Sequence, residues 1–165
     1  MKYRWIALAL FPLVVVAHAD VKVDFVNPEK FSDIRDNTGF TNKAVLKDIE
    51  AYLVTQFGKR MPGKEVHISV TDVNLAGEIE PVGGMAQWLR VMRTVTSPSM
   101  ELTYEIRDGD KVVQQGTAKL RDIDYQNSFN SMSSSDPLRY EKHMMDRWMD
   151  REFGRAVAAG SPEGR

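Results

Sequence analysis

Residues 100–120 read MELTYEIRDGDKVVQQGTAKL, and this stretch decides the fold class of the chain. Every second residue from Met100 to Ile106 is apolar and the residues between them are polar, which is the period of a strand with one buried face. The sequence Asp108-Gly109-Asp110 then predicts a tight turn into a second strand over residues 111–120. The stretch therefore predicts an antiparallel hairpin with one apolar side.

Further strands and two helices are predicted on either side of this hairpin. The alternating pattern recurs over residues 21–26 and 66–71. Apolar residues at helical spacing predict a helix over residues 42–57, capped by Thr41, and another from Asp136 to about Ala158. Three glycines and a proline in residues 75–87 predict a long flexible connection, and residues 88–95 can form a strand. The sequence leaves open whether residues 75–98 form a strand or a loop.

These elements predict an α+β fold. Helices with one apolar stripe and strands with one apolar face bury both by forming a two-layer sandwich. We expect a four- or five-stranded, mainly antiparallel sheet with two amphipathic helices packed on one face. The predicted domain covers residues 20–160, and residues 161–165 are expected to form a disordered tail.

The first nineteen residues have the features of a cleaved signal peptide. Lys2 and Arg4 precede twelve apolar residues, and Ala17-His18-Ala19 provides an A-x-A cleavage site. The apolar run is shorter than the roughly 20 residues that cross a bilayer. Asp20, rather than a cysteine, follows the cleavage site, so no lipid is expected there. We expect export to the periplasm as a protein that is not a lipoprotein and has no transmembrane segment.

The composition of the mature chain excludes several function classes. The first nineteen residues hold two of the 22 Lys and Arg residues and none of the 23 Asp and Glu residues, so residues 20–165 carry a net charge of −3. This balance does not predict binding to nucleic acid. The absence of cysteine excludes disulfides, thiol catalysis and zinc–thiolate sites.

Four fragments match the pattern of a known family. They are PEKFSD (28–33), TDVNLAG (71–77), the run from ELTYEI (101–106) to Asp122 and Tyr125, and YEKHMMDRW (140–148). Together with the signal peptide, they resemble the proteobacterial domain of unknown function 3016 family of small exported proteins. The resemblance implies a single exported domain. The family has no assigned activity, so the resemblance assigns no functional residue.

Residues 88–93 have the composition of a binding surface. If they form a strand, Trp88, Arg90 and Met92 share one face, while Arg93 lies on the other. Trp, Met and Arg are enriched at protein interfaces, so these four residues form a candidate partner-binding surface. The alternative is an edge strand that its arginines protect against aggregation.

A second candidate site follows the last predicted strand. Asp122, Asp124 and Asn127, with Tyr125 between them, present hard oxygen atoms that suit a divalent metal or a small ligand. The glycine turn and the glutamate of a calcium-binding loop are missing. The alternative is that Asp and Asn end the strand by bonding local backbone amides.

The sequence contains no recognised catalytic motif. GxSxG and HExxH do not occur, and the two histidines of the mature chain, His67 and His143, are expected on solvated faces. No catalytic residue and no cofactor is predicted, although an unrecognised hydrolase stays a third alternative. The first hypothesis is a non-enzymatic periplasmic binding or accessory module with another envelope protein as its partner. The second is a small-ligand or divalent-metal-binding periplasmic protein.

Overall fold

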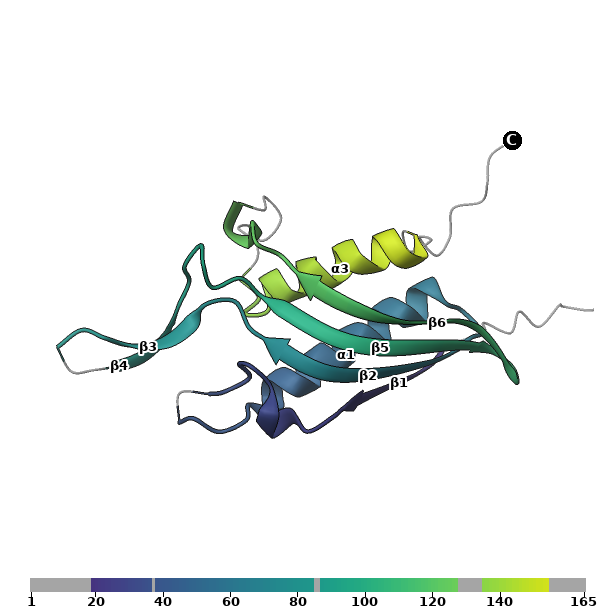
Figure 1. Cartoon of the computed structure of the whole chain (residues 1–165), viewed down its shortest axis with the longest axis horizontal. Coiled ribbons are helices and arrows are strands. Elements are labelled where there is room, and N and C mark those ends of the chain that lie inside the picture. Colours follow the sequence, from purple (N-terminus) through teal and green to yellow (C-terminus); the bar gives the residue numbers. More distant parts are fainter. Residues whose placement is uncertain (1–18, 37, 85–86, 128–134, 155–165) are drawn as a thin grey trace, which may run out of the picture.

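The strands predicted over residues 100–120 lie at the centre of the main sheet. The computed structural model describes residues 19–36, 38–84, 87–127 and 135–154. In it, β5 (Ser99–Asp108) pairs antiparallel with β6 (Lys111–Arg121) on one side and with β2 (Glu65–Asn74) on the other. β1 (Asp20–Phe25) completes a four-stranded sheet of order β1-β2-β5-β6 (Figure 1).

β1 is the one parallel strand of this sheet. It pairs with β2 so that Val21 lies beside Val66 and Val23 beside Ile68. Parallel neighbours need a crossover connection. The chain makes it through the short 3-10 helix η1 (Pro28–Lys30) and the helix α1 (Lys43–Arg60) before it enters β2. The sheet is therefore mainly antiparallel, as the sequence predicts.

Helix α1 follows the prediction along its length but not at its ends. Its N-cap is Asn42, whose side chain accepts a hydrogen bond from the Val45 N–H at 3.2 Å, rather than Thr41. Thr41 instead forms a β-bridge with Arg35, which holds its backbone outside the helix. The helix also continues beyond the predicted end to Arg60.

Helix α3 (Arg139–Phe153) starts three residues after the predicted capping residue Asp136. The Asp136 carboxylate accepts a hydrogen bond from the Leu138 N–H at 2.8 Å, so it still binds the backbone at the start of the helix. The predicted end of this helix near Ala158 and the predicted tail over residues 161–165 lie outside the described residues, as do residues 1–18 of the predicted signal peptide.

Both helices pack on the same face of the main sheet, and the core lies between the two layers (Figure 1). Rings of Phe57, Tyr104, Trp148 and Phe153 meet there with centroids 5.2 to 6.0 Å apart. β5 directs its alternate apolar residues Met100, Leu102, Tyr104 and Ile106 into this core, and β6 contributes Ala118 and Leu120. The predicted α+β two-layer sandwich is confirmed. Among the described residues, no helix has the length and apolar character needed to cross a membrane.

The structure of the segment 75–98 differs from the long flexible connection predicted over residues 75–87. β3 (Glu78–Val82) and β4 (Gln87–Val91) pair antiparallel with each other and form a separate two-stranded ribbon. Gly77, with φ +77°, lies at the root of the ribbon, and Gly83, with φ +75°, lies in the turn at its tip. These glycines permit the bend of the backbone at the root of the ribbon and the hairpin turn at its tip. Figure 1 shows the ribbon projecting from the sandwich.

Candidate functional site

The topology brings several connections to one end of the sandwich. β1, β2 and β6 end there, β5 begins there, and both helices start there (Figure 1). Consequently the segments 26–42, 75–98 and 122–127 lie at this end, which we call the ribbon end. The loops at one end of a rigid scaffold are a common place for a binding site.

Exposed apolar side chains gather at the ribbon end. Trp88 is 52% exposed and Leu89 is 47% exposed, on opposite faces of β4. Phe40 and Val82 are also exposed and lie on the neighbouring loop and on β3. We call these four residues the ribbon-end surface. Exposed apolar groups that gather in one region mark interaction sites more often than isolated ones do.

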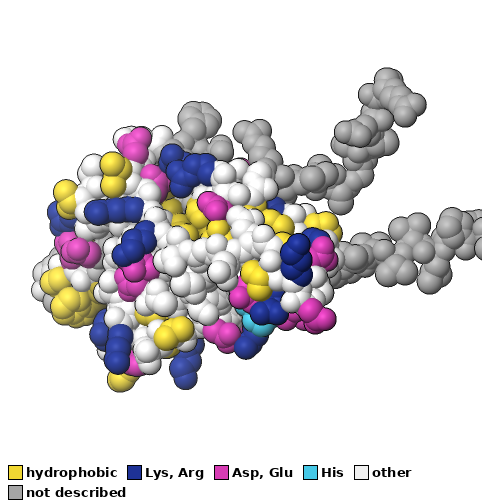
Figure 2. Space-filling view, turned by 45° about the vertical axis from the view of Figure 1, so that its right-hand side comes forward, with side chains coloured by type: hydrophobic (Ala, Val, Ile, Leu, Met, Phe, Trp, Pro, Cys, Tyr) yellow, Lys and Arg dark blue, Asp and Glu magenta, His cyan; other side chains and the backbone are white. Residues whose placement is uncertain are grey.

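A groove borders this surface at Trp88. It has a volume of about 680 Å³ and lies between the loop that contains Thr38 and Gly39 and the ribbon residues Glu78, Ile79 and Trp88. Figure 2 shows Lys and Arg side chains interspersed with Asp and Glu side chains on the face in view, rather than a field of one sign. The groove lining itself combines charged side chains with the apolar Ile79 and Trp88; the charged ones are Asp33, Arg35, Asp36 and Glu78.

The four residues predicted as a partner-binding surface take different positions. Trp88 lies on the exposed part of β4, whereas Arg90 turns toward the body of the protein. Met92 packs against a small second core, and Arg93 forms an exposed ion pair with Glu80. Of the four side chains, Trp88 is the apolar one most available to a partner. The predicted surface itself stays a prediction.

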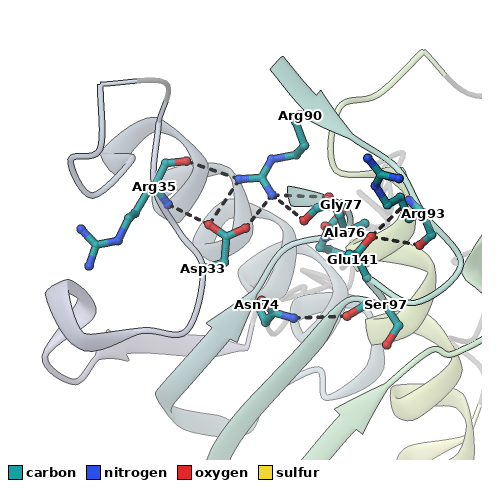
Figure 3. A network of polar contacts seen from close by, with 10 residues as sticks. Asp33, Arg35, Asn74, Ala76, Gly77, Arg90, Arg93, Ser97 and Glu141 are labelled. Atoms are coloured by element: carbon teal, nitrogen blue, oxygen red, sulfur yellow. Dashed lines mark hydrogen bonds and ion pairs between the residues drawn. The ribbon is translucent and has the colours of Figure 1, made fainter. Parts of the chain in front are cut away.

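Arg90 fixes the ribbon to the loop after β1. Its guanidinium donates to both carboxylate oxygens of Asp33, at 2.6 and 3.4 Å, and to the carbonyl oxygen of Gly77 at 3.0 Å (Figure 3). The side chains of Arg90 and Asp33 are only 21% and 20% exposed. The sequence alone gives no reason to expect that replacing Arg90 lowers stability, but these contacts make Arg90 a structural residue.

A small second core lies under the root of the ribbon. Ala76, Tyr125 and Tyr140 are buried together, and Met92 packs against them. The two tyrosine rings meet edge to face with centroids 4.8 Å apart. The Tyr125 hydroxyl also donates to the carbonyl oxygen of Arg93 at 2.7 Å. The chain that leaves β4 is thus held on the sandwich, while the tip of the ribbon stays exposed.

Glu141 is a buried carboxyl group at the same root. Its Oε1 atom accepts a hydrogen bond from the Ala76 N–H at 2.7 Å (Figure 3), and its Oε2 atom has no hydrogen-bond partner among the described residues. The residue is 2% exposed. Burial raises the pKa of Glu141, although the Ala76 N–H and the charge of Arg90 act in the opposite direction.

This burial predicts a pH dependence of stability. The folded-state pKa of Glu141 is raised above its ordinary value of 4.5, so between the two pKa values the folded protein holds a proton that the unfolded chain has lost. The contribution of Glu141 to stability is therefore complete below pH 4.5 and decreases as the pH rises through that interval. We expect Glu141→Gln to be more stable than the natural protein at pH 7, with a smaller difference at pH 4. Urea denaturation of both proteins at each pH measures this, and a difference independent of pH would contradict it.

The predicted metal or ligand site forms the turn that directly follows the end of β6. Asp122 is buried, its Oδ1 atom accepts from the Asp124 N–H at 3.2 Å, and Arg147 lies 3.6 Å away. Asp124 accepts a hydrogen bond from the Asn127 amide, and Tyr125 lies in the second core with its ring turned away from solvent. No group of three or more His, Cys, Asp or Glu side chains that could hold a metal occurs in the part of the chain that the structure describes. These contacts are of the kind expected from the alternative interpretation, in which Asp and Asn end the strand by bonding local backbone amides.

The structural roles of three residues of this site were not predicted from the sequence. Asp33 and Arg90 are 57 positions apart, and nothing local in either segment indicates their pairing. Gly77 was one of the glycines that predicted flexibility. The sequence does contain a signal for Glu141, because this residue lies three residues after Leu138 and four before Met145, on the buried side of α3. An acidic residue at a core position of a helix indicates a buried carboxyl group.

Comparison with known proteins gives one match. A family model described as a protein of unknown function (DUF3016) matches residues 19–151. No curated protein and no solved structure matches the chain.

Proposed function

The chain belongs to the DUF3016 family of proteins of unknown function, and from its geometry we propose that it is a non-enzymatic periplasmic module that binds another protein of the envelope. The ribbon-end surface is the binding site. The observation that carries this proposal is the ribbon itself, whose root is fixed to the sandwich by Arg90 and the second core while Trp88 and Leu89 stay exposed.

A fixed root and an exposed tip suit recognition. Tryptophan supplies a large contact area and is enriched among residues that dominate binding energy. Because the ribbon is held in place before binding, ordering it costs less free energy than ordering a flexible loop. Trp88 and Leu89 lie on opposite faces of β4, so a partner can enclose the ribbon or bind along the groove beside Trp88.

The periplasmic location rests on the signal-peptide features of residues 1–19. Two observations support it. β1 begins at Asp20, the first residue after the predicted cleavage site, and the Asp20 N–H donates to the Lys64 carbonyl oxygen at 3.0 Å. The family match begins at residue 19. Cleavage after Ala19 would therefore leave the described strands and helices complete.

The function is tested by removing the apolar side chains of the ribbon tip. We expect Trp88→Ala combined with Leu89→Ala to reduce capture of the partner from crosslinked periplasm by about tenfold or more, because two central contacts are lost. Both side chains are about half exposed, so the free energy of unfolding should change by no more than about 0.5 kcal/mol. Quantitative mass spectrometry of the captured material measures the effect.

Val113→Ala is the matched control. Val113 is 48% exposed and lies on β6 next to the hairpin turn, at the other end of the sheet from the ribbon. The control should capture the partner as well as the natural protein does. Equal capture by all three proteins, or equal loss in both variants, would remove the ribbon-end surface from the proposal.

A further inference from the structure

The outer edge of β4 is an unpaired strand edge. β4 pairs with β3 on one side only, and the ribbon that they form is separate from the main sheet (Figure 1). Among the described residues, no hydrogen bond joins the backbone of Gln87–Val91 to a group other than β3. An unpaired edge offers a row of N–H donors and C=O acceptors, which another extended backbone matches.

Pro81 determines which backbone groups of the ribbon face outward. Proline has no N–H, so within a sheet its nitrogen faces away from the ladder. Pro81 lies opposite Trp88, and Ile79 lies opposite Arg90. Because the direction of the backbone groups alternates from one rung to the next, Trp88 and Arg90 direct their N–H and C=O groups outward from β4. On β3 the matching edge keeps only the Ile79 N–H, so β4 has the more complete edge.

The edge of β4 also lacks the charges that protect the other edges. Exposed charged side chains on an edge strand prevent unwanted strand pairing. Both outer strands of the main sheet carry them, namely Asp20, Lys22 and Asp24 on β1 and Lys111, Lys119 and Arg121 on β6. The charged residue of β4 is Arg90, whose guanidinium pairs with Asp33 at 2.6 Å (Figure 3). Arg93 follows the end of β4 and pairs with Glu80. The arginines of this segment therefore do not protect its edge.

The side chains beside this edge determine which kind of strand fits. Trp88 and Leu89 are about half exposed on opposite faces of β4, so an added strand would place neighbouring side chains against both. We propose that the envelope partner presents an extended, uncharged segment with consecutive apolar residues, which pairs with the outer edge of β4 as the third strand of the ribbon. This inference rests on the proposed function, because it states how the partner occupies the same site.

A second copy of the chain fits this edge less well than a segment of another protein. Two five-residue β4 strands paired with each other would be about 17 Å long. They would bury the exposed halves of two tryptophans and two leucines, roughly 500 Å² in all, whereas a stable dimer buries about 1,200 Å² or more. A segment of another protein gains further contact area, since the groove of about 680 Å³ lies beside Trp88.

The test attaches a strand-forming peptide to the tip of the ribbon. The chain has no cysteine, so Gly84→Cys supplies a single attachment point, and a Cβ atom at Gly84 meets nothing within 4 Å. The probe is acetyl-Thr-Val-Ile-Val-Thr-Gly-Gly-Ser-Cys-amide, joined to the purified protein by a disulfide. Attachment through its C-terminal end lets the peptide run antiparallel to β4, and the tether gives it a high local concentration.

Amide hydrogen exchange measured by NMR reports the pairing. We expect the attached peptide to slow exchange of the Trp88 and Arg90 amides at least tenfold, relative to a control peptide in which the amides of Val-Ile-Val are N-methylated. Both peptides keep the same side chains, so the comparison isolates backbone pairing. The same five residues attached through an N-terminal cysteine would run antiparallel to β3, and they should leave exchange of the Ile79 amide unchanged.

Three results would overturn the proposal. One is equal exchange with the two peptides, and another is equal protection of Ile79 by the peptide that runs along β3. The third is a dimer of the natural protein in sedimentation experiments whose Trp88 and Arg90 amides are already protected, because a second copy would then occupy the edge.

The attached peptide and the capture experiment separate this proposal from the proposed function. Capture that depends on Trp88 and Leu89, without protection by the peptide, would remove strand addition and keep the binding module. Protection by the peptide, without any captured partner, would remove the envelope partner and keep β4 as an edge that accepts a strand.

Discussion

Replacing Gly77 with alanine is expected to lower the free energy of unfolding by about 3 kcal/mol, from backbone strain and overpacking together. Gly77 has φ +77°, a conformation that residues with a Cβ atom rarely adopt. A Cβ atom at this position would lie 2.6 Å from the Val91 carbonyl oxygen and 2.8 Å from Met92 Sδ. The Val91 contact is to backbone, so relieving it requires the two strands of the ribbon to move apart.

Gly83→Ala separates the steric effect from backbone strain. Gly83 has nearly the same backbone angle, φ +75°, but a Cβ atom there would meet nothing within 4 Å. We expect this control to cost about 1 kcal/mol, from the backbone conformation alone. Urea denaturation followed by tryptophan fluorescence measures both variants. Equal losses would show that the close approach of Gly77 to Val91 does not contribute to stability.

Replacing Arg90 with methionine has the second largest expected effect. The variant keeps an unbranched side chain of similar length but leaves the Asp33 carboxylate, which is 20% exposed, without its cation. The Gly77 carbonyl oxygen also loses a donor at 3.0 Å. We expect a loss of about 2 kcal/mol in the free energy of unfolding, below the range for fully buried pairs because both side chains are partly solvated.

Arg93→Met is the matched control for Arg90→Met. Arg93 also pairs with a carboxylate, that of Glu80, but its side chain is 55% exposed. An exposed pair of this kind is well screened by solvent and contributes little to the free energy of unfolding, so we expect a much smaller loss in this variant. Hydrogen exchange should also show faster opening of the amides at the ribbon root in Arg90→Met than in Arg93→Met. Equal stability of the two variants would contradict the structural role of Arg90.

The sandwich could be predicted because its evidence is local. Strand β5 shows the two-residue period over residues 100–106, the turn after it indicates β6, and α1 shows its apolar stripe within eighteen residues. Burial of one face is the physical cause of both patterns, so each segment carries its own evidence. The ends of α1 were less predictable because Thr41 and Asn42 can both cap a helix, and a β-bridge to Arg35 decides between them.

The ribbon could not be predicted in the same way. β3 and β4 have no buried face along most of their length, so apolar alternation is weak there. Gly77 and Gly83 predict flexibility as readily as they predict turns, and only the pairing of Glu78 with Val91 distinguishes the two. The role of Arg90 depends on Asp33, which lies far away in the sequence. Contacts of this kind leave no periodic pattern in one sequence.

The most direct test of the binding module is site-specific photocrosslinking in living cells. A photoreactive amino acid replaces Leu89 in one strain and Val113 in another, since both positions are about half exposed but lie at opposite ends of the sheet. We predict one discrete crosslinked species of the processed protein from position 89 and none from position 113. No crosslink at position 89, or the same products from both positions, would contradict the proposal that the ribbon end binds an envelope partner.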